Sequence, residues 1–120
     1  MTVTLQFTVH GQASGYYSQG ARPNWTRKTQ YVEWKKLVQG VASAYTVLPL
    51  VATEVAPVRI TTVAWFKNRV HPDTENIHKG CVDALFYGSK GNGDKYTAGA
   101  FSWPQYDPDD PRVEVTIERL

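Results

Sequence analysis

The chain has little cysteine, little methionine and no long apolar run. Its 120 residues include a single cysteine, Cys81, and a single methionine. One cysteine excludes an intrachain disulfide framework. No apolar stretch approaches the roughly 20 residues that a membrane-spanning helix needs. The N-terminus alternates polar and apolar residues and lacks the apolar centre of a signal peptide. We therefore expect a cytoplasmic protein that has no membrane partner.

The chain also has little excess of either charge. Lys and Arg total 13 against 11 Asp and Glu, a net charge of +2, and charged residues are 20% of the chain while hydrophobic residues are 42%. These proportions exclude a disordered chain and fit one globular domain over residues 1–120. The mild basic excess permits an anionic partner without demanding one.

Four segments have the patterns of β-strands. Residues 3–9 and 112–120 alternate apolar and polar side chains, which predicts two strands with one solvated face each. Residues 57–66 are almost continuously β-branched or apolar, so we expect a central strand covered on both faces. Residues 96–103 are a further expected strand. A glycine-rich loop at 88–93 precedes that strand.

Two helices are expected between these strands. Residues 30–45 carry apolar side chains three and four positions apart, with Thr29 as the N-cap, and the expected stripe is Tyr31, Trp34, Leu37, Val38, Val41, Ala42 and Tyr45. The second helix starts at Asp73, ends near Gly88, and buries Ile77, Cys81, Ala84 and Leu85. The order β-α-β-α-β-β predicts a small α+β fold, a mixed sheet with two main helices packed on it.

Acidic residues gather where the expected elements begin or end. Asp73 and Glu75 lie at the start of the second helix, and Asp94 follows the glycine-rich loop. Carboxylates that converge from separate elements are the ligands that hard divalent cations such as Mg²⁺ prefer. An alternative stays open for each acid, because Asp73 also suits a helix cap and Asp94 also suits a turn.

Lys79 follows Glu75 by four residues and precedes Asp83 by four. This spacing is typical of exposed helix ion pairs, each worth only ~0.3 kcal/mol. Beside a metal site, however, a lysine one turn along the helix would stabilise negative charge on a phosphate. Asp83 would then orient Lys79 rather than bind metal, and Asn76 is expected to support the site in a similarly indirect way.

The first loop and the first helix form a basic segment with interleaved aromatic residues. The basic and aromatic residues that we expect to contact DNA are Arg22, Trp25, Arg27, Lys28, Lys35 and Lys36. A solvated helix face beside core aromatics explains the same pattern, and both interpretations stay open. The stretch GSKGNGDK lacks the residue order of a phosphate-binding P-loop, so no nucleotide cofactor is expected.

Residues 72–85, PDTENIHKGCVDAL, resemble the signature helix of the RusA-like Holliday-junction resolvases. That family reads Pro-Asp-x-Asp-Asn, then Lys three residues on, then Asp-x-Leu, with a further Asp after a loop. Asp94 stands at the place of that last Asp, and the flanking segments are also similar, so the resemblance covers most of the chain. Two departures are Glu75, where the family has Asp, and Gly93, where it often has a second Asp.

The resemblance implies a homodimeric, Mg²⁺-dependent endonuclease of a bacterium or phage that resolves four-way DNA junctions, with Mn²⁺ able to replace Mg²⁺. It implies that Asp73, Glu75 and Asp94 bind the metal and that Lys79 acts at the scissile phosphate. Two alternatives remain. One is a non-catalytic nucleic-acid-binding domain of the same fold, which the Glu75 departure favours. The other is a structural protein whose acids only cap a helix.

Overall fold

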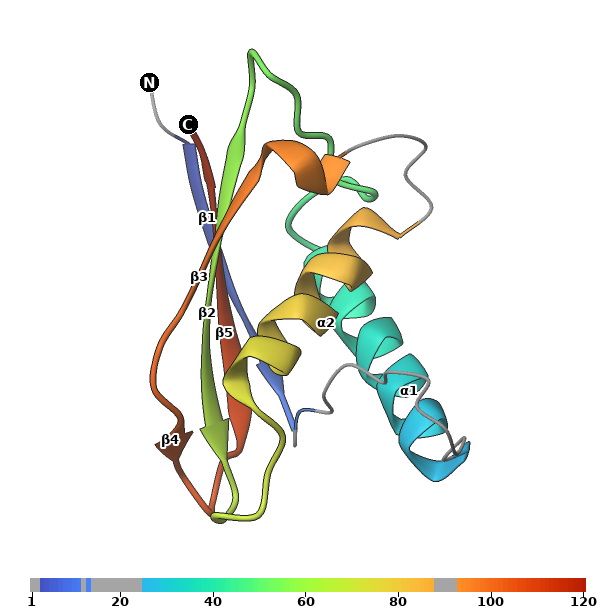
Figure 1. Ribbon diagram of the computed structural model, residues 1–120, viewed down its shortest axis with the longest axis vertical. Helices are drawn as coiled ribbons and strands as arrows, with labels where there is room; N and C mark the ends of the chain where they lie inside the picture. Colours follow the sequence, from blue (N-terminus) through green and yellow to red (C-terminus); the bar gives the residue numbers. More distant parts are fainter. Residues whose placement is uncertain (1–2, 12, 14–24, 88–92) are drawn as a thin grey trace.

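The computed structural model describes the backbone of residues 3–11, 13, 25–87 and 93–120, and the side chains of all of these except residues 3, 25–28, 93 and 94. The elements run in the order β1 (Val3–His10), α1 (Trp25–Ala42), β2 (Val58–Phe66), α2 (Thr74–Phe86), the 3-10 turn η1 (Gly93–Tyr96), β3 (Thr97–Phe101), β4 (Gln105–Tyr106) and β5 (Arg112–Arg119). The predicted α+β fold with a mixed sheet and two main helices is confirmed (Figure 1).

The sheet has the strand order β1-β5-β2-β3, and β4 pairs with the far end of β2. The last strand, β5, lies between β1 and β2 and is antiparallel to both. In contrast, β3 and β4 are parallel to β2. Parallel neighbours cannot be joined by a hairpin and need a crossover connection, which α2 supplies here. Consequently α2 starts at the end of β2 and runs back toward the start of β3.

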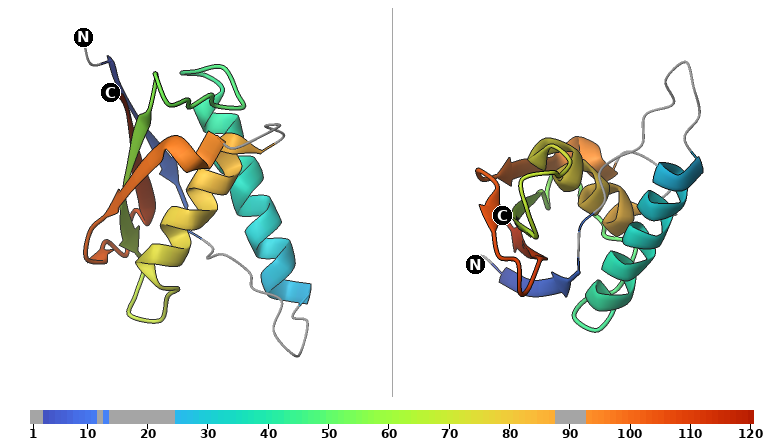
Figure 2. Two further views of the ribbon diagram at one scale, coloured as in Figure 1. Left: turned by 45° about the horizontal axis from the view of Figure 1, so that its top comes forward. Right: turned by 90° about the horizontal axis from the view of Figure 1, so that it is seen from below.

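Both helices cover the same face of the sheet (Figures 1 and 2). The core lies between them and the strand residues that point to that face, such as Val58, Ile60, Val113 and Val115, which are all fully buried. Because a buried face recurs at every second residue of a strand, this packing reproduces the alternation in the sequence. Within the described residues, no helix is long and apolar enough to cross a membrane.

The expectation that β2 is covered on both faces is wrong. Burial along β2 alternates, with Arg59 exposed and Thr61, Val63 and Trp65 only partly buried on the outer face. Of these outer residues, Trp65 is covered by a neighbour in the sheet, since the guanidinium carbon of Arg112 on β5 lies 4.2 Å from the centre of the Trp65 ring.

The first helix is displaced from its predicted range of 30–45. It begins at Trp25 and ends at Ala42, so Thr29 lies inside the helix and is not its N-cap. Of the expected stripe, Leu37 is 44% exposed and Tyr45 is 56% exposed, whereas the buried members are Tyr31, Trp34, Val38 and Ala42. Tyr45 follows the helix and stacks its ring on Phe7, so its apolar contact is made from a turn.

The second helix matches its prediction closely. Asp73 is the N-cap, and the predicted buried residues Ile77, Cys81, Ala84 and Leu85 are at most 1% exposed. The helix ends at Phe86, and Gly88 with most of the predicted loop lies outside the described residues. The predicted strand at 96–103 is shorter in the structure, and the sequence did not predict η1 or β4.

Candidate functional site

The start of α2 carries two exposed carboxylates, those of Asp73 and Glu75. Asp73 has extended backbone angles (φ −61°, ψ 138°), and its Oδ1 accepts a 2.8 Å hydrogen bond from the Glu75 amide. This cap satisfies an amide that has no partner inside the helix. It also holds Asp73 beside the positive end of the helix dipole. Asp73 is therefore a helix cap, and that role occupies one of its two carboxylate oxygens.

His71 fixes the loop that leads into α2. Its ring stacks on Phe66, the last residue of β2, with centroids 3.9 Å apart and planes inclined by 8°. Nδ1 lies 2.7 Å from the Pro72 carbonyl oxygen, and Nε2 lies 2.8 Å from the Tyr106 hydroxyl. A carbonyl oxygen only accepts, so Nδ1 carries a proton and donates it to Pro72, while Nε2 shares a hydrogen bond with the Tyr106 hydroxyl. This contact ties β4 to the residue two positions before Asp73.

The His71–Tyr106 contact was not anticipated from the sequence. The two residues are separated by 35 positions, and the short strand β4 that carries Tyr106 has no clear sequence pattern. The guanidinium carbon of Arg69 lies 4.2 Å from the centre of the Tyr106 ring on the same end of the sheet. The loop before α2 is thus held by aromatic and hydrogen-bonding contacts to both β2 and β4.

His78 packs α2 against the sheet, one turn after Glu75. It is 9% exposed, and its Nδ1 lies 2.9 Å from the Thr62 hydroxyl oxygen on β2. Its ring also contacts Phe101 on β3, with centroids 5.6 Å apart. Burial lowers the pKa of His78, and the nearby Glu75 carboxylate offsets part of that lowering. The neutral imidazole is therefore a packing group that fixes the first turns of α2.

Lys79 and Asp83 lie on the outer side of α2, where Lys79 is exposed and Asp83 is half-buried. The Asp83 carboxylate accepts a 2.9 Å hydrogen bond from the Tyr31 hydroxyl on α1. From the sequence we predicted that Asp83 orients Lys79, and that remains a prediction. Asp83 also has a partner on the other helix, Tyr31, and Asn76 is exposed in the first turn of α2.

Lys35 of the predicted DNA-contacting set lies between two aromatic rings. Its Nζ is 4.7 Å from the centre of the Tyr31 ring and 5.5 Å from that of Tyr87. Lys36 is exposed beside it on α1. Arg22 lies outside the described residues. Trp25, Arg27 and Lys28 form the first turn of α1 rather than a loop, and their side chains are not among those described.

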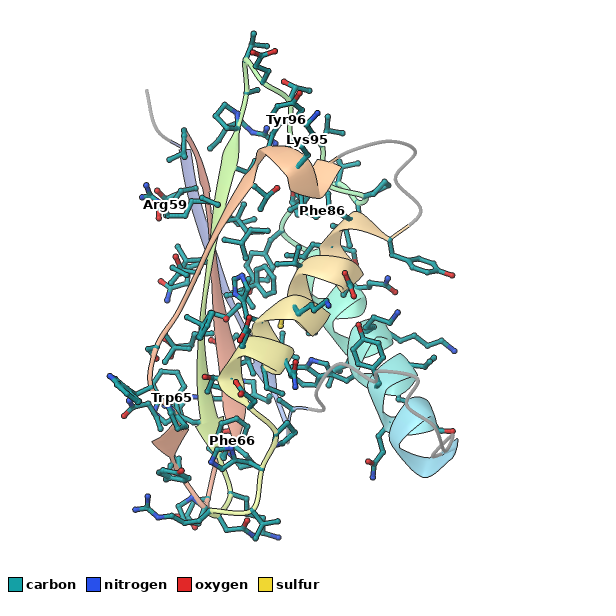
Figure 3. The ribbon with its side chains drawn as sticks, in the orientation of Figure 1. Arg59, Trp65, Phe66, Phe86, Lys95 and Tyr96 are labelled. Atoms are coloured by element: carbon teal, nitrogen blue, oxygen red, sulfur yellow. The ribbon has the colours of Figure 1, made fainter. Side chains whose placement is uncertain are left out.

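Asp94 belongs to η1, at the opposite end of α2 from Asp73. In Figure 3, Lys95 and Tyr96 of η1 lie near Phe86, the last residue of α2, while Trp65 and Phe66 mark the other end of the sheet. A helix of 13 residues is about 20 Å long, since it rises ~1.5 Å per residue. The backbone positions of Asp94 and Asp73 are therefore too far apart for both side chains to bind one cation within a single chain.

Asp73 and Glu75 supply carboxylate oxygens, the donors that Mg²⁺ prefers. Mg²⁺ is commonly held by one or two protein carboxylates, with water and substrate phosphates completing its shell. The donors at the start of α2 therefore fit Mg²⁺. Among the side chains that the structure describes, no three His, Cys, Asp or Glu gather closely enough to form a larger metal cluster, and Asp94 is not one of these side chains.

Comparison with known protein families matches residues 7–118 to a model described as "Endodeoxyribonuclease RusA". The matched range runs from β1 to β5 and includes every element around α2. A search of curated proteins found no match.

Proposed function

This chain belongs to the RusA family of endodeoxyribonucleases, and we propose that it is a Mg²⁺-dependent nuclease that resolves four-way DNA junctions by paired nicks. Mn²⁺ would replace Mg²⁺. The proposed metal ligands are Asp73, Glu75 and Asp94, and Lys79 is the proposed catalytic lysine. The partners are branched DNA and a second copy of the chain.

The capped start of α2 is the observation that carries this proposal. Asp73 and Glu75 are two exposed carboxylates, and the Glu75 backbone amide fixes the Asp73 carboxylate by a hydrogen bond. Contacts of His71 with Phe66 and Tyr106 hold the loop before them. A fixed Asp73 carboxylate with a second carboxylate close by on the helix end supports metal binding, because catalytic groups must be held close to their working geometry.

Asp94 would enter each site from the second copy. Within one chain α2 separates Asp94 from Asp73 and Glu75 by nearly its full length. A two-fold axis that sets two α2 helices antiparallel brings the end of one helix beside the start of the other. Each of the two sites then takes Asp73 and Glu75 from one protomer and Asp94 from its partner. Two equivalent sites also suit two nicks in opposed strands.

The reaction would be in-line hydrolysis of a phosphodiester, and the bound metal ion supplies charge neutralisation and an activated water. Asp73 and Glu75 would hold that ion and orient the scissile phosphate. Lys79, exposed one turn beyond Glu75, would stabilise the negative charge that builds on the phosphate oxygens. His78, buried and hydrogen-bonded to Thr62, would keep the turn between these residues in place.

Affinity for DNA would come from the basic residues of the first loop and helix. Lys35 is held over the rings of Tyr31 and Tyr87, and Lys36 is exposed next to it. The complete proposed set is Arg22, Trp25, Arg27, Lys28, Lys35 and Lys36. Contacts of this kind with phosphates are independent of sequence and weaken as salt rises, because bound counterions are released.

The direct test is nicking of a synthetic four-way junction with Mg²⁺ present, omitted and restored. Asp73→Asn is the sharpest variant, because Asn caps a helix about as well as Asp but has lost the carboxylate charge. We expect Asp73→Asn and Asp94→Asn each to lower the nicking rate at least about 100-fold, while junction binding persists. Cleavage at the wild-type rate in both variants would exclude the proposed site.

Mixing these two variants tests whether the site is shared. In a mixed dimer, the Asp73→Asn protomer still supplies Asp94, and the Asp94→Asn protomer still supplies Asp73 and Glu75. A shared arrangement therefore leaves one intact site, and nicking returns on mixing although each variant alone is inactive. If both ligands came from the same chain, every site in the mixture would carry one defect and no activity would return.

A second candidate is a non-catalytic DNA-binding domain, and the observation favouring it is Glu75 in place of the family's Asp. The longer side chain moves a carboxylate, and Mg²⁺ tolerates little distortion of its octahedral geometry. Junction binding that weakens with salt, without any metal-dependent nicking, would establish this alternative.

A further inference from the structure

Trp103, between β3 and β4, leaves its ring almost fully in solvent. The side chain is 85% exposed, which is more than for any other aromatic residue whose side chain the structure describes. One exposed apolar side chain is ordinary on a protein surface. The backbone around Trp103, in contrast, has two features that hold this ring in a defined place.

The first feature is an extra residue in the edge of the sheet. Thr62 of β2 pairs with Phe101 of β3. Trp65 of β2 pairs with Gln105 of β4. Between these pairs β2 advances by three residues while the edge advances by four. An extra residue of this kind is a β-bulge, and bulges re-aim a side chain and are common at sheet edges beside active sites.

The second feature is that the backbone at Trp103 is braced. The Trp103 carbonyl oxygen accepts a 3.0 Å hydrogen bond from the Ser102 hydroxyl and a 3.3 Å hydrogen bond from the side-chain amide of Gln105. Pro104 follows directly, and its ring fixes the backbone angle φ. An exposed ring on a braced backbone loses little conformational freedom when it binds a partner.

Two contacts place the bulge beside the start of α2. Before the bulge, the Phe101 ring contacts the His78 ring, with centroids 5.6 Å apart. After the bulge, the Tyr106 hydroxyl lies 2.8 Å from Nε2 of His71. The chain between these two contacts therefore runs alongside the segment between the two histidines, at the end of the sheet where α2 begins (Figure 1). That segment carries both carboxylates proposed to bind the metal.

We propose that Trp103 stacks on a nucleobase that is unstacked at the branch point of a DNA junction, and that this contact makes the protein prefer branched DNA to linear duplex. This role rests on the proposed function, because the base would lie beside the acids that hold the metal. Bases inside a duplex are stacked on both faces, and exposing one costs free energy. At a branch point the stack is interrupted. Stacking on an aromatic ring is tolerant of base identity, because every base has a π-face.

The surroundings of Trp103 favour DNA over a protein partner. Arg69 is exposed, and its guanidinium carbon lies 4.2 Å from the centre of the Tyr106 ring, so a cation is held close to the same segment. An aromatic ring with a guanidinium nearby suits both parts of a nucleotide, the base and the phosphate. The proposed metal site beside them would hold a phosphate of the same strand.

The test measures binding without metal, so it does not depend on nicking. A synthetic four-way junction and a linear duplex of the same arm sequence are titrated with wild type and with three Trp103 variants. We expect Trp103→Ala to weaken junction binding about 10-fold or more and duplex binding less than about twofold. Trp103→Phe keeps an aromatic face and should stay within about threefold of wild type. Trp103→Leu, apolar without an aromatic face, should resemble Trp103→Ala.

Val55→Ala is the matched control. Val55 is 93% exposed and lies in the turn that precedes β2, whereas β4 pairs with the other end of β2. This variant removes exposed apolar surface far from the bulge, so it should bind both DNAs as wild type does. Circular dichroism checks that all variants fold, which the exposure of both side chains leads us to expect.

A fluorescent base gives a second readout that a purely structural role would not change. The analogue 2-aminopurine emits strongly when unstacked and weakly when stacked. With the analogue at the branch point, wild type and Trp103→Phe should quench its emission on binding. At saturating protein, Trp103→Leu should leave the emission high. Quenching by Trp103→Leu equal to that by wild type would overturn the stacking contact.

Three binding results would also overturn this role. They are junction binding by Trp103→Ala at the wild-type affinity, an equal loss for junction and duplex, and Trp103→Leu as effective as wild type. Light scattering covers a further case. If Trp103→Ala changes the oligomeric state and loses junction binding with it, the ring serves a contact between copies of the protein, and the base-stacking role is wrong.

The outcomes separate this role from the nuclease. If wild type binds junctions through Trp103 but does not nick them with Mg²⁺, the stacking contact stands and the proposed function falls. If wild type nicks junctions, and Trp103→Ala binds and nicks them equally well, the proposed function stands and the stacking contact falls.

Discussion

The hydroxyl of Tyr31 on α1 donates a 2.9 Å hydrogen bond to the Asp83 carboxylate on α2. Tyr31 is 6% exposed and Asp83 is half-buried, so this polar contact lies at the partly covered junction of the two helices. The same ring supports the Lys35 ammonium group. One side chain thus joins the two helices and positions a cation that we propose contacts DNA.

Tyr31→Phe should destabilise the protein by about 1–2 kcal/mol, because it leaves a half-buried carboxylate without this donor while the ring contacts persist. Urea unfolding measures the change. Tyr87→Phe is the matched control, since the Tyr87 side chain is 68% exposed and loss of its hydroxyl should change the free energy of unfolding by less than about 0.5 kcal/mol. Equal effects of the two variants would contradict the importance of the Tyr31–Asp83 bond.

Gly99→Ala should destabilise the protein by about 1–3 kcal/mol through overpacking. A Cβ atom at this position would lie 2.5 Å from Nε2 of His78, and that ring is held by Thr62. Gly40→Ala is the control, because a Cβ at Gly40, inside α1, meets nothing within 4 Å. That change should stabilise by about 0.5–1 kcal/mol, since Ala is the better helix residue. A Gly99→Ala protein as stable as wild type would mean that His78 moves aside freely.

Stability should fall as pH drops below about 6.5, and His78 should be one cause. Burial lowers its pKa in the folded protein from the ordinary value of 6.5. Below that value the unfolded chain binds a proton that folded His78 resists, so acid favours unfolding by at most ~1.4 kcal/mol per pH unit for this group.

The free energies of unfolding of wild type and His78→Gln at pH 7.5 and 5.5 isolate this contribution. We expect the wild type to lose more stability between the two pH values than the variant, which has no imidazole to protonate at this site. The same loss in both proteins would assign the pH dependence to other groups.

Two substitutions of Asp73 should separate its structural role from its chemical role. Asp73→Ala removes the cap and should cost about 1 kcal/mol of stability, whereas Asp73→Asn should leave stability nearly unchanged. Both should abolish nicking, because neither retains the carboxylate. Thermal melting and the junction assay, run on the same preparations, measure the two effects. If Asp73→Asn nicks at the wild-type rate and only the destabilised Asp73→Ala variant loses activity, Asp73 acts only as a helix cap.

The sequence by itself determined the features that depend only on residues close together in the chain. The cap at Asp73 and the buried stripe through Ile77, Cys81 and Leu85 were predictable, because capping and helical periodicity are local. The strands at 3–10 and 112–119 were predictable for the same reason, since their alternation shows one buried face. The helix from Trp25 was misplaced because its first turn carries no apolar repeat that marks its start.

Only the tertiary structure decided which distant residues meet. Insertion of β5 between β1 and β2, and the parallel pairing of β2 with β3, follow from packing across the whole sheet. That pairing sets α2 as the crossover and so holds Asp94 and Asp73 at its opposite ends. The same topology brings Tyr106 to His71 and Tyr31 to Asp83. Contacts of this kind depend on how the core closes, and no short window of sequence contains that information.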